Sequence, residues 1–255
     1  MSTLGVVILS LPGMQHLGAC LESVRWAEAV LLLHLSAEAP PALPGSHSAL
    51  MVRKLASLGG VEGFCKELGT DWILHLWGEE VVGAELRDEI SALCRRDLAA
   101  SPQGYRIAIR SQLLGCWVQG SLLGPSPAPR LSRRAEEIAP GWWNSGRTQR
   151  AGYPAVARGW IGDYSAAALD NGLRRIEDIS GLWKERLEAA GAQPGLSSYL
   201  LTPLQAWSKT LLSNGIWAGG IAGMTLATLA AYAPLLTAAK LWEARHVKPN
   251  AKGKV

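Results

Sequence analysis

The chain has 255 residues, of which 48% are hydrophobic and 18% are charged. Nearly half of the residues can bury apolar surface, which excludes an intrinsically disordered chain, and the length suffices for one substantial core. The formal net charge is only +4, so the charge balance gives no reason to expect a nucleic acid as partner.

Buried strands alternate with a helix at the start of the chain. The apolar run Leu4–Leu11 ends at Pro12 and has no basic residue before it, which predicts a strand and not a signal peptide. Apolar residues recur at helical spacing from Leu17 to Trp26, and Ala29–Leu35 is a second apolar run. We therefore expect an α/β fold with a mainly parallel sheet and helices on both faces.

The same alternation continues after a loop. Residues 37–48 are rich in Ala, Pro, Gly and Ser and predict this loop, followed by a helical pattern through Leu68. Asp71–Leu76 then predicts the third strand, and Ala84–Leu98 has the apolar spacing of an amphipathic helix. Tyr105–Ile109 alternates as a further strand does.

The middle of the chain has little periodicity. Gly115–Gly159 is rich in Gly, Pro, Trp and Arg and predicts loops over the sheet, where ligand contacts concentrate. Leu173–Ala190 returns to a helical pattern. The four cysteines lie far apart without a C-x-x-C pair, which favours buried reduced thiols over a zinc or redox site.

The last part of the chain is unusually apolar. Between Lys209 and Lys240 lie 30 residues with no Asp, Glu, Lys, Arg or His. Ile216–Ala239 is long enough for a transmembrane helix, but its many Gly and Ala residues and Pro234 leave spanning, re-entrant and interfacial arrangements open. A buried helical hairpin in a soluble or oligomeric core is the alternative.

Small and basic residues accompany this segment. Gly215, Gly219 and Gly223 recur every fourth residue, a spacing that lets a second helix approach closely in lipid and suits a protein partner or a homo-oligomer. Arg245 and the lysines after it form a basic tail suited to the anionic cytoplasmic leaflet. We expect a division into residues 1–195 and a membrane-associated C-terminal part, 196–255.

Several short motifs occur in a recognisable order. They are Cys20–Val24, Trp26–Leu33, Gly69–Leu74, Glu79–Glu80, Gly104–Ile107, Leu114–Trp117, Arg130–Arg134, Gly215–Gly223 and Ala239–Glu243. Together they resemble the family 2 glycosyltransferases, most closely the bacterial branch that adds sugars to lipopolysaccharide cores. The resemblance implies a GT-A-like (Rossmann-like) fold, a nucleotide-diphospho sugar donor, a divalent Mg²⁺ or Mn²⁺, and an inverting transfer to a lipid-linked or polysaccharide acceptor at the cytoplasmic face of the inner membrane.

The resemblance also assigns roles to carboxylates and one histidine. Glu79 and Glu80 match the metal motif, whose hard cation needs oxygen ligands near the leaving diphosphate, while Trp77 stands in place of the first Asp of that motif. A solely structural use of the two glutamates, at the start of the next helix, is the alternative. His34 occupies the position of a strand-end Asp that holds the nucleotide.

The remaining candidates are arginines and aspartates. Arg130, Arg133 and Arg134 match an arginine motif whose guanidinium groups can bind diphosphate oxygens bidentately; a solvated basic turn is the alternative. Asp163 or Asp170 is the expected base for the acceptor hydroxyl.

Three hypotheses follow from these assignments. The first is an active membrane-associated glycosyltransferase. The second is a catalytically inactive relative that serves as a scaffold or regulatory subunit at the membrane, and the third is an unrelated α/β binding protein with a membrane anchor.

Overall fold

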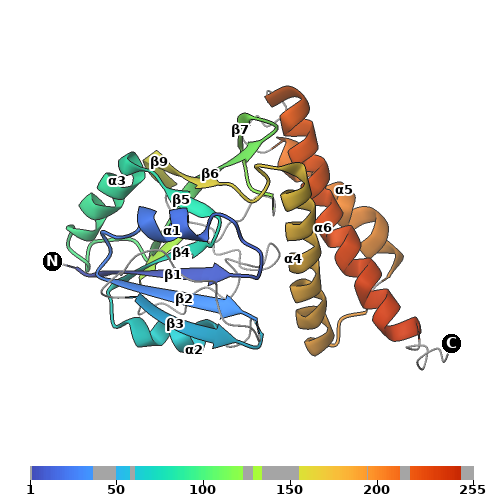
Figure 1. The fold of residues 1–255 in the computed structure, drawn as a ribbon, viewed down its shortest axis with the longest axis horizontal. Coiled ribbons are helices and arrows are strands. Elements are labelled where there is room, and N and C mark those ends of the chain that lie inside the picture. The colour runs from blue at the N-terminus through green and yellow to red at the C-terminus, as the bar shows by residue number, and fades with distance from the viewer. Residues whose placement is uncertain are drawn as a thin grey trace.

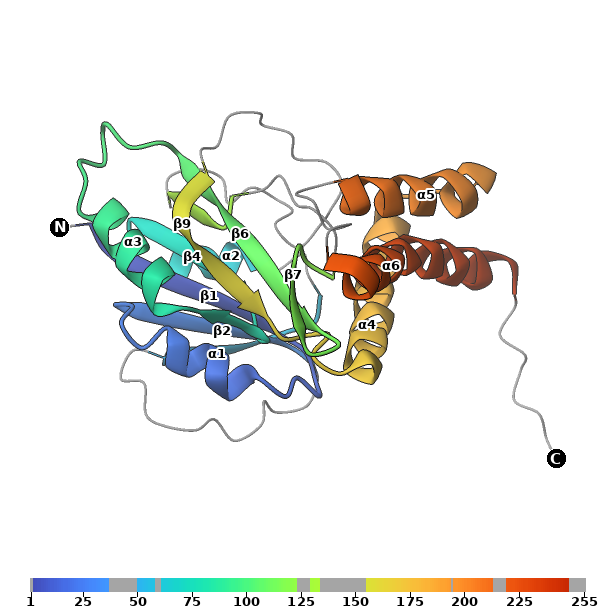
Figure 2. The ribbon, with the colours of Figure 1, turned by 90° about the horizontal axis from the view of Figure 1, so that it is seen from above.

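The computed structural model describes residues 2–36, 50–57, 61–122, 129–133, 155–193, 195–212 and 219–247. Within these ranges a twisted sheet with helices on its faces adjoins a group of three long helices, α4, α5 and α6 (Figures 1 and 2). The predicted α/β class is confirmed.

The strands and helices alternate along the first half of the chain. The strands are β1 (Leu4–Ser10), β2 (Ala29–Leu35), β3 (Leu50–Leu55), β4 (Trp72–Trp77), β5 (Glu80–Val82), β6 (Gly104–Leu113), β7 (Cys116–Gln119), β8 (Leu131–Arg133) and β9 (Ala155–Asp163). The helices are α1 (Leu17–Ser23), α2 (Val61–Cys65) with the 3₁₀ turn η2 (Lys66–Leu68), α3 (Ala84–Cys94), α4 (Leu169–Ala189), α5 (Leu196–Leu212) and α6 (Gly220–His246).

The sheet has a parallel half and a mixed half. Its order is β3-β2-β1-β4-β8-β6-β9-β5, with β7 paired to β6. All pairings among β1, β2, β3 and β4 are parallel, β8 is antiparallel to both of its neighbours, and β6 is parallel to β9. The carboxyl ends of β1, β2 and β3 point toward α4 (Figure 1), so the residues just after these strands lie between the sheet and the helical group.

Both faces of the parallel half are covered, which explains why all seven residues of β1 are buried. Val6 and Ile8 belong to a core with residues of α1 and α3. Val7 and Leu9 face the opposite way, into a second core that includes residues of α2. The expected helices on both faces are therefore confirmed, and the period of two along a strand divides its side chains between the two cores.

Four strands occur where we expected a helix or loops: β3, β7, β8 and β9, the last of which begins within the predicted loop region Gly115–Gly159. β3 lies within the segment expected to lead into a helix, because its backbone pairs with β2 along six residues. It has exposed Arg53 and Lys54, as edge strands often do. β7 and β8 lie within the predicted loop region, and β7 forms a hairpin with β6 through Leu114 and Gly115, both with positive φ.

The cysteines follow the expected pattern in part. Cys20, Cys65 and Cys94 are buried, whereas Cys116 is exposed at the start of β7.

The helical group has a core of its own. Ile176, Ile179 and Trp183 of α4 pack with Leu226 and other residues of α6, and the same core includes side chains from β6 and β7. Helix α5 lies beside α6 (Figure 2), and the Tyr199 hydroxyl donates a hydrogen bond to the Ala238 carbonyl oxygen at 3.0 Å. This core therefore joins side chains from both sides of the boundary expected at residue 195.

Helix α6 contains much of the long uncharged segment. It is the one helix in the described part of the chain that is long and apolar enough to cross a membrane, and half of its apolar window is buried inside the protein. Gly223 is buried, Gly219 lies next to Val118 of β7, and Gly215 lies outside the described residues. Core helices of water-soluble proteins can be equally long and apolar, so α6 alone is weak support for membrane insertion.

Candidate active site

The candidate site begins at the carboxyl ends of neighbouring parallel strands. Ser10 and His34 are paired residues in the register of β1 and β2, and Leu9 of β1 pairs with Trp77 of β4. The His34 Nδ1 lies 2.9 Å from the Ser10 Oγ, and both residues are buried. This edge of an open α/β sheet is where ligands generally bind.

Glu80 is held by two buried hydrogen-bond donors. The guanidinium of Arg130 donates to both carboxylate oxygens, with Nη1–Oε2 at 3.0 Å and Nη2–Oε1 at 2.8 Å, and the Trp77 backbone N–H donates to Oε2 at 2.8 Å. Burial raises the pKa of Glu80 above its usual value, and the positive charge of Arg130 opposes that rise. The bidentate geometry suits a fixed structural pair.

Glu79 has a different cation beside it. The Arg175 Nε of α4 lies 3.8 Å from the Glu79 Oε2, and the guanidinium carbon of Arg175 lies 4.4 Å from the centre of the Trp77 ring. All three residues are buried. Burial raises the pKa of Glu79, and Arg175 opposes the rise. Arg175 thus combines an ion pair with a cation–π contact.

Asp163 completes the buried cluster. It pairs with Glu80 in the register of β5 and β9. Its Oδ2 accepts a hydrogen bond from the Ser111 Oγ at 2.9 Å, and its Oδ1 accepts one from the Ser165 backbone N–H at 2.9 Å. Asp170, the other predicted base, is exposed in the first turn of α4. The structure therefore brings Asp163, but not Asp170, into the cluster with Glu79 and Glu80.

The three arginines of the predicted diphosphate motif differ in their burial and contacts. Arg130 is buried beside His75, whose backbone oxygen it approaches at 3.4 Å, whereas Arg133 is half-buried and directs its Nη1 to the Ser101 carbonyl oxygen at 3.5 Å. Arg134 lies outside the described residues. Of this motif, only Arg130 is shown to contact the acidic cluster.

His75 lies beneath the cluster in β4 and stays neutral. Its Nε2 lies 3.0 Å from the Ser132 Oγ. Burial lowers the pKa of His75 from 6.5 to about 3, and the positive charge of Arg130 adds to the effect. It is therefore a core side chain, as strand histidines without metal-ligand spacing usually are.

The loop after β1 closes over the turn that follows β4. A side chain at Gly78 would place its Cβ 2.7 Å from the Met14 Sδ, so the Met14 side chain of this loop packs directly on the turn. The Asn171 side chain of α4 donates to the Gln15 side-chain oxygen at 3.2 Å. The turn that carries Glu79 is thus enclosed between the β1 loop and the start of α4.

The carboxylates of the cluster fit a divalent metal poorly. Among the described residues, no group of three or more His, Cys, Asp or Glu side chains could hold a metal ion. Both oxygens of Glu80 already accept hydrogen bonds from Arg130 or the Trp77 backbone, and Glu79 lies beside the guanidinium of Arg175. Mg²⁺ and Mn²⁺ require several oxygen ligands in regular geometry. The expected metal at Glu79 and Glu80 therefore finds no support in this arrangement.

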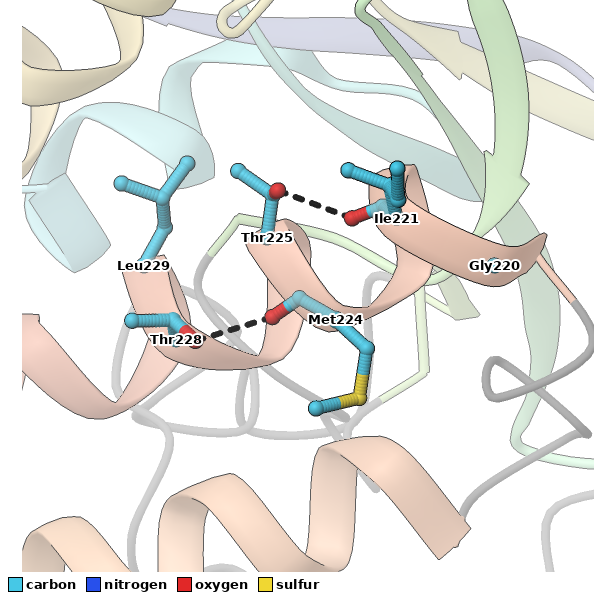
Figure 3. A pocket seen from close by; sticks show the side chains of 6 residues that line it. All are labelled: Gly220, Ile221, Met224, Thr225, Thr228 and Leu229. Carbon is cyan, nitrogen blue, oxygen red and sulfur yellow. Dashed lines mark hydrogen bonds between the residues drawn. The ribbon is translucent and has the colours of Figure 1, made fainter.

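Aromatic side chains and an apolar groove lie beyond Asp163. Trp117 packs edge-on against Trp160 and Tyr164, with ring centroids 5.0 and 5.3 Å apart. Next to this hairpin, a groove of about 560 Å³ runs along the first turns of α6 (Figure 3). Its lining residues are Gly220, Ile221, Met224, Thr225, Thr228 and Leu229.

The groove presents mainly apolar surface. The Thr225 and Thr228 hydroxyls donate hydrogen bonds to backbone oxygens one turn earlier, at 2.8 and 2.9 Å (Figure 3). Because these hydroxyls bond within the helix, mainly methyl and methylene groups line the groove.

Sequence reasoning missed Arg175 and Ser111. The sequence did contain a signal for Arg175, because this residue lies on the same buried face of α4 as Ile176, Ile179 and Trp183. A charged residue on a buried helical face needs a partner. Ser111 gave no such signal, since one serine in an alternating strand has no distinctive spacing.

Comparison with known proteins agrees with the resemblance seen in the motifs. No protein-family model matches the chain. The chain is 25% identical, over 97% of its length and 95% of the relative, to the lipopolysaccharide core biosynthesis glycosyltransferase LpsC of Rhizobium meliloti (strain 1021).

Solved structures of S. aureus TarS are also similar. One shares 10% identity over 99% of this chain and 57% of that chain, with a TM-score of 0.40; the TarS 1-349 structure shares 10% identity over 96% and 92%, with a TM-score of 0.40. Likeness at this level is too distant to support an inference, so the relationship rests on the sequence relative, which matches nearly end to end.

Proposed function

We propose, from this end-to-end similarity to a glycosyltransferase, that the chain transfers a sugar from a nucleotide-diphospho donor to a glycan or lipid-linked acceptor of the bacterial cell envelope. The observation that carries the proposal is the match with LpsC over 97% of the chain. The buried cluster of acidic and arginine side chains at the carboxyl ends of the strands is the location that we propose for the reaction.

The chemistry assigns one role to Asp163. As the acceptor hydroxyl attacks the anomeric carbon of the donor, the new C–O bond forms, the bond to the diphosphate breaks, and the hydroxyl proton passes to a base. Asp163 is the carboxylate that accepts it, since each of its oxygens keeps a second lone pair beside the bonds from Ser111 and Ser165. Ser111 and Ser165 hold it in place.

We propose that this reaction takes place at the cytoplasmic face of the inner membrane, as the resemblance implies, and that α5 contacts the membrane. Five of its leucines are between 54% and 76% exposed: Leu196, Leu200, Leu201, Leu204 and Leu212. The helix contains Lys209 and no acidic residue. A helix with exposed leucines and a positive charge suits the interface of an anionic bilayer.

A transfer assay tests the proposal. The full chain is incubated with uridine and guanosine diphospho-sugars and a lipid-linked core oligosaccharide, and the released nucleotide diphosphate is measured. We expect turnover, and we expect Asp163→Asn to lower kcat at least about 100-fold, the range for loss of a general base. Donor affinity should change little. A large loss in Asp170→Asn with full activity in Asp163→Asn would move the base to Asp170.

The second candidate function is a scaffold or regulatory subunit at the membrane. It is favoured by one observation: the carboxylates of the metal motif are paired with buried arginines. Donor binding with no release of nucleotide diphosphate, for any donor and acceptor pair in the assay, would support this function over the enzyme.

A further inference from the structure

Arg175 has a buried nitrogen for which the described residues supply no hydrogen-bond partner. Its side chain is 5% exposed, and this nitrogen is Nη1. A buried donor without a partner costs free energy, more so when it is charged. Such a group is expected where a ligand completes the hydrogen bonding.

The contact between Arg175 and Glu79 is too long to be a full hydrogen bond. The Nε–Oε2 distance of 3.8 Å exceeds the 2.7–2.9 Å typical of a charge-assisted hydrogen bond. Arg130, by contrast, uses two nitrogens on Glu80. Arg175 is therefore the buried arginine of the cluster with an unused donor.

Trp77 explains how the guanidinium stays in place. Trp77 replaces the first Asp of the family metal motif, and its ring faces the Arg175 guanidinium at 4.4 Å. An aspartate there would offer a metal an oxygen, whereas an indole ring offers a cation its π face. The substitution and the buried arginine thus fit each other.

We propose that the Arg175 guanidinium takes the place of the divalent cation at this motif and binds the diphosphate of the donor without a metal. The inference rests on the proposed function. A planar guanidinium can donate two parallel hydrogen bonds to phosphate oxygens and carries a fixed positive charge. It thereby supplies the charge neutralisation that a leaving diphosphate needs.

Calorimetric titration of the full chain with UDP and with GDP tests this inference. Each titration is run in EDTA and in Mn²⁺, and Mn²⁺ is also titrated alone. For the wild type we expect the same affinity in EDTA and in Mn²⁺, within twofold, and no binding of Mn²⁺ alone up to 1 mM, roughly the weak limit of useful metal affinity.

Two variants make the result specific to this side chain. Arg175→Gln should weaken diphosphate binding at least about tenfold, because it removes the charge and the free donor. Arg174→Gln is the matched control, since Arg174 is an exposed arginine on the same helix, and it should bind within twofold of the wild type. If Arg175→Gln does not fold, Arg175→Lys keeps the charge without the planar fork and should bind several-fold more weakly.

Three results would overturn the inference: loss of diphosphate binding in EDTA, wild-type affinity in Arg175→Gln, or Mn²⁺ binding that Glu79→Gln abolishes. Failure of the wild type to bind either diphosphate with or without Mn²⁺ would instead refute the proposed function. The diphosphate part of the inference would then fall with it, and the titration of Mn²⁺ alone would decide whether a metal occupies the motif.

Discussion

The cluster around Glu80 and the surface of α5 are opposite exceptions to the usual burial of apolar side chains and exposure of charged ones. In the cluster, Glu79, Glu80, Arg130, Arg175 and Asp163 are all at most 5% exposed. On α5, five leucines are more than half exposed. One region therefore places charges inside the protein and the other places apolar side chains outside it.

Both departures cost stability in water unless something offsets them. Buried charges need partners, and one partner suffices only when the hydrogen bonding is complete. Exposed contiguous apolar surface usually marks a contact with another molecule or with lipid. We therefore expect a polar ligand to complete the hydrogen bonding of the cluster and an apolar surface to cover the leucines of α5.

The largest effect is expected at the Arg130–Glu80 pair. Arg130→Ala should lower the free energy of unfolding by about 3–5 kcal/mol, because it leaves the Glu80 carboxylate buried without its partner. Urea unfolding measures the change. Arg25→Ala, which breaks an exposed pair with Glu22, is the control and should cost no more than about 1 kcal/mol.

The double variant Arg130→Met with Glu80→Leu sharpens this test. Replacing both partners of a buried pair with apolar side chains is often nearly neutral, so the double variant should recover most of the loss. Equal destabilisation in the single and double variants would mean that the pair does more than neutralise its own charges.

The next effect concerns the exposed leucines of α5. Leu200→Ser with Leu204→Ser should weaken binding to vesicles that contain anionic lipid at least about 100-fold, since burial of each leucine contributes about 1.5–3 kcal/mol. Vesicle flotation measures the bound fraction. The fold should be little affected, with a change in unfolding free energy of about 0.5 kcal/mol or less.

An exposed pair of leucines on another helix provides the control. Leu173 and Leu187 of α4 are 41% and 38% exposed, and changing both to Ser should leave vesicle binding unchanged. Equal losses from the two double variants would show that no specific face of the helical group contacts lipid.

The smallest effect is a pH dependence from His75. Because its pKa is lowered to about 3 in the folded chain, the unfolded chain binds an extra proton between about pH 3 and pH 6.5, and stability falls as the pH falls through that window. From pH 7 to pH 5 the loss should be about 2 kcal/mol. The raised pKa values of Glu79 and Glu80 act in the opposite sense, since their contribution declines as the pH rises above about 4.5.

Comparison with His75→Gln isolates this contribution. Glutamine can still bond to the Ser132 hydroxyl but does not titrate. Unfolding curves recorded at pH 7 and pH 5 should therefore show about 2 kcal/mol more acid destabilisation in the wild type. Parallel changes in the two proteins would contradict the assignment.

The central strands could be predicted because burial on both faces leaves a direct record in the sequence. Leu4–Leu11, Ala29–Leu35 and Asp71–Leu76 are apolar runs, and they became β1, β2 and β4 within a residue or two at each end. β3 has no such apolar run, since it is an edge strand and is only partly buried. Its charged residues fit the pattern of an exposed helical surface equally well. Its strand conformation comes from pairing with β2, which local sequence does not specify.

The candidate site could be predicted from the sequence only in part, for a similar reason. Motif order brought Glu79, Glu80 and Arg130 into one hypothesis, and the structure places these three side chains in one cluster. Arg175 lies 96 residues after Glu79 and belongs to no motif, so only the packing of α4 against the sheet reveals it. The sequence also could not distinguish Asp163 from Asp170 as the proposed base. Asp163 ends β9 and Asp170 lies in the first turn of α4, and only the tertiary structure shows which of them is near Glu80.

The core shared by α4, α6, β6 and β7 has a practical consequence for the tail of the protein. Ending the chain near residue 195 would uncover Ile176, Ile179 and Trp183, which α6 now shields from water. Such a shortened chain should therefore self-associate during expression. A version of the protein that ends at α4 would first need polar residues on the face of α4 that packs against α6.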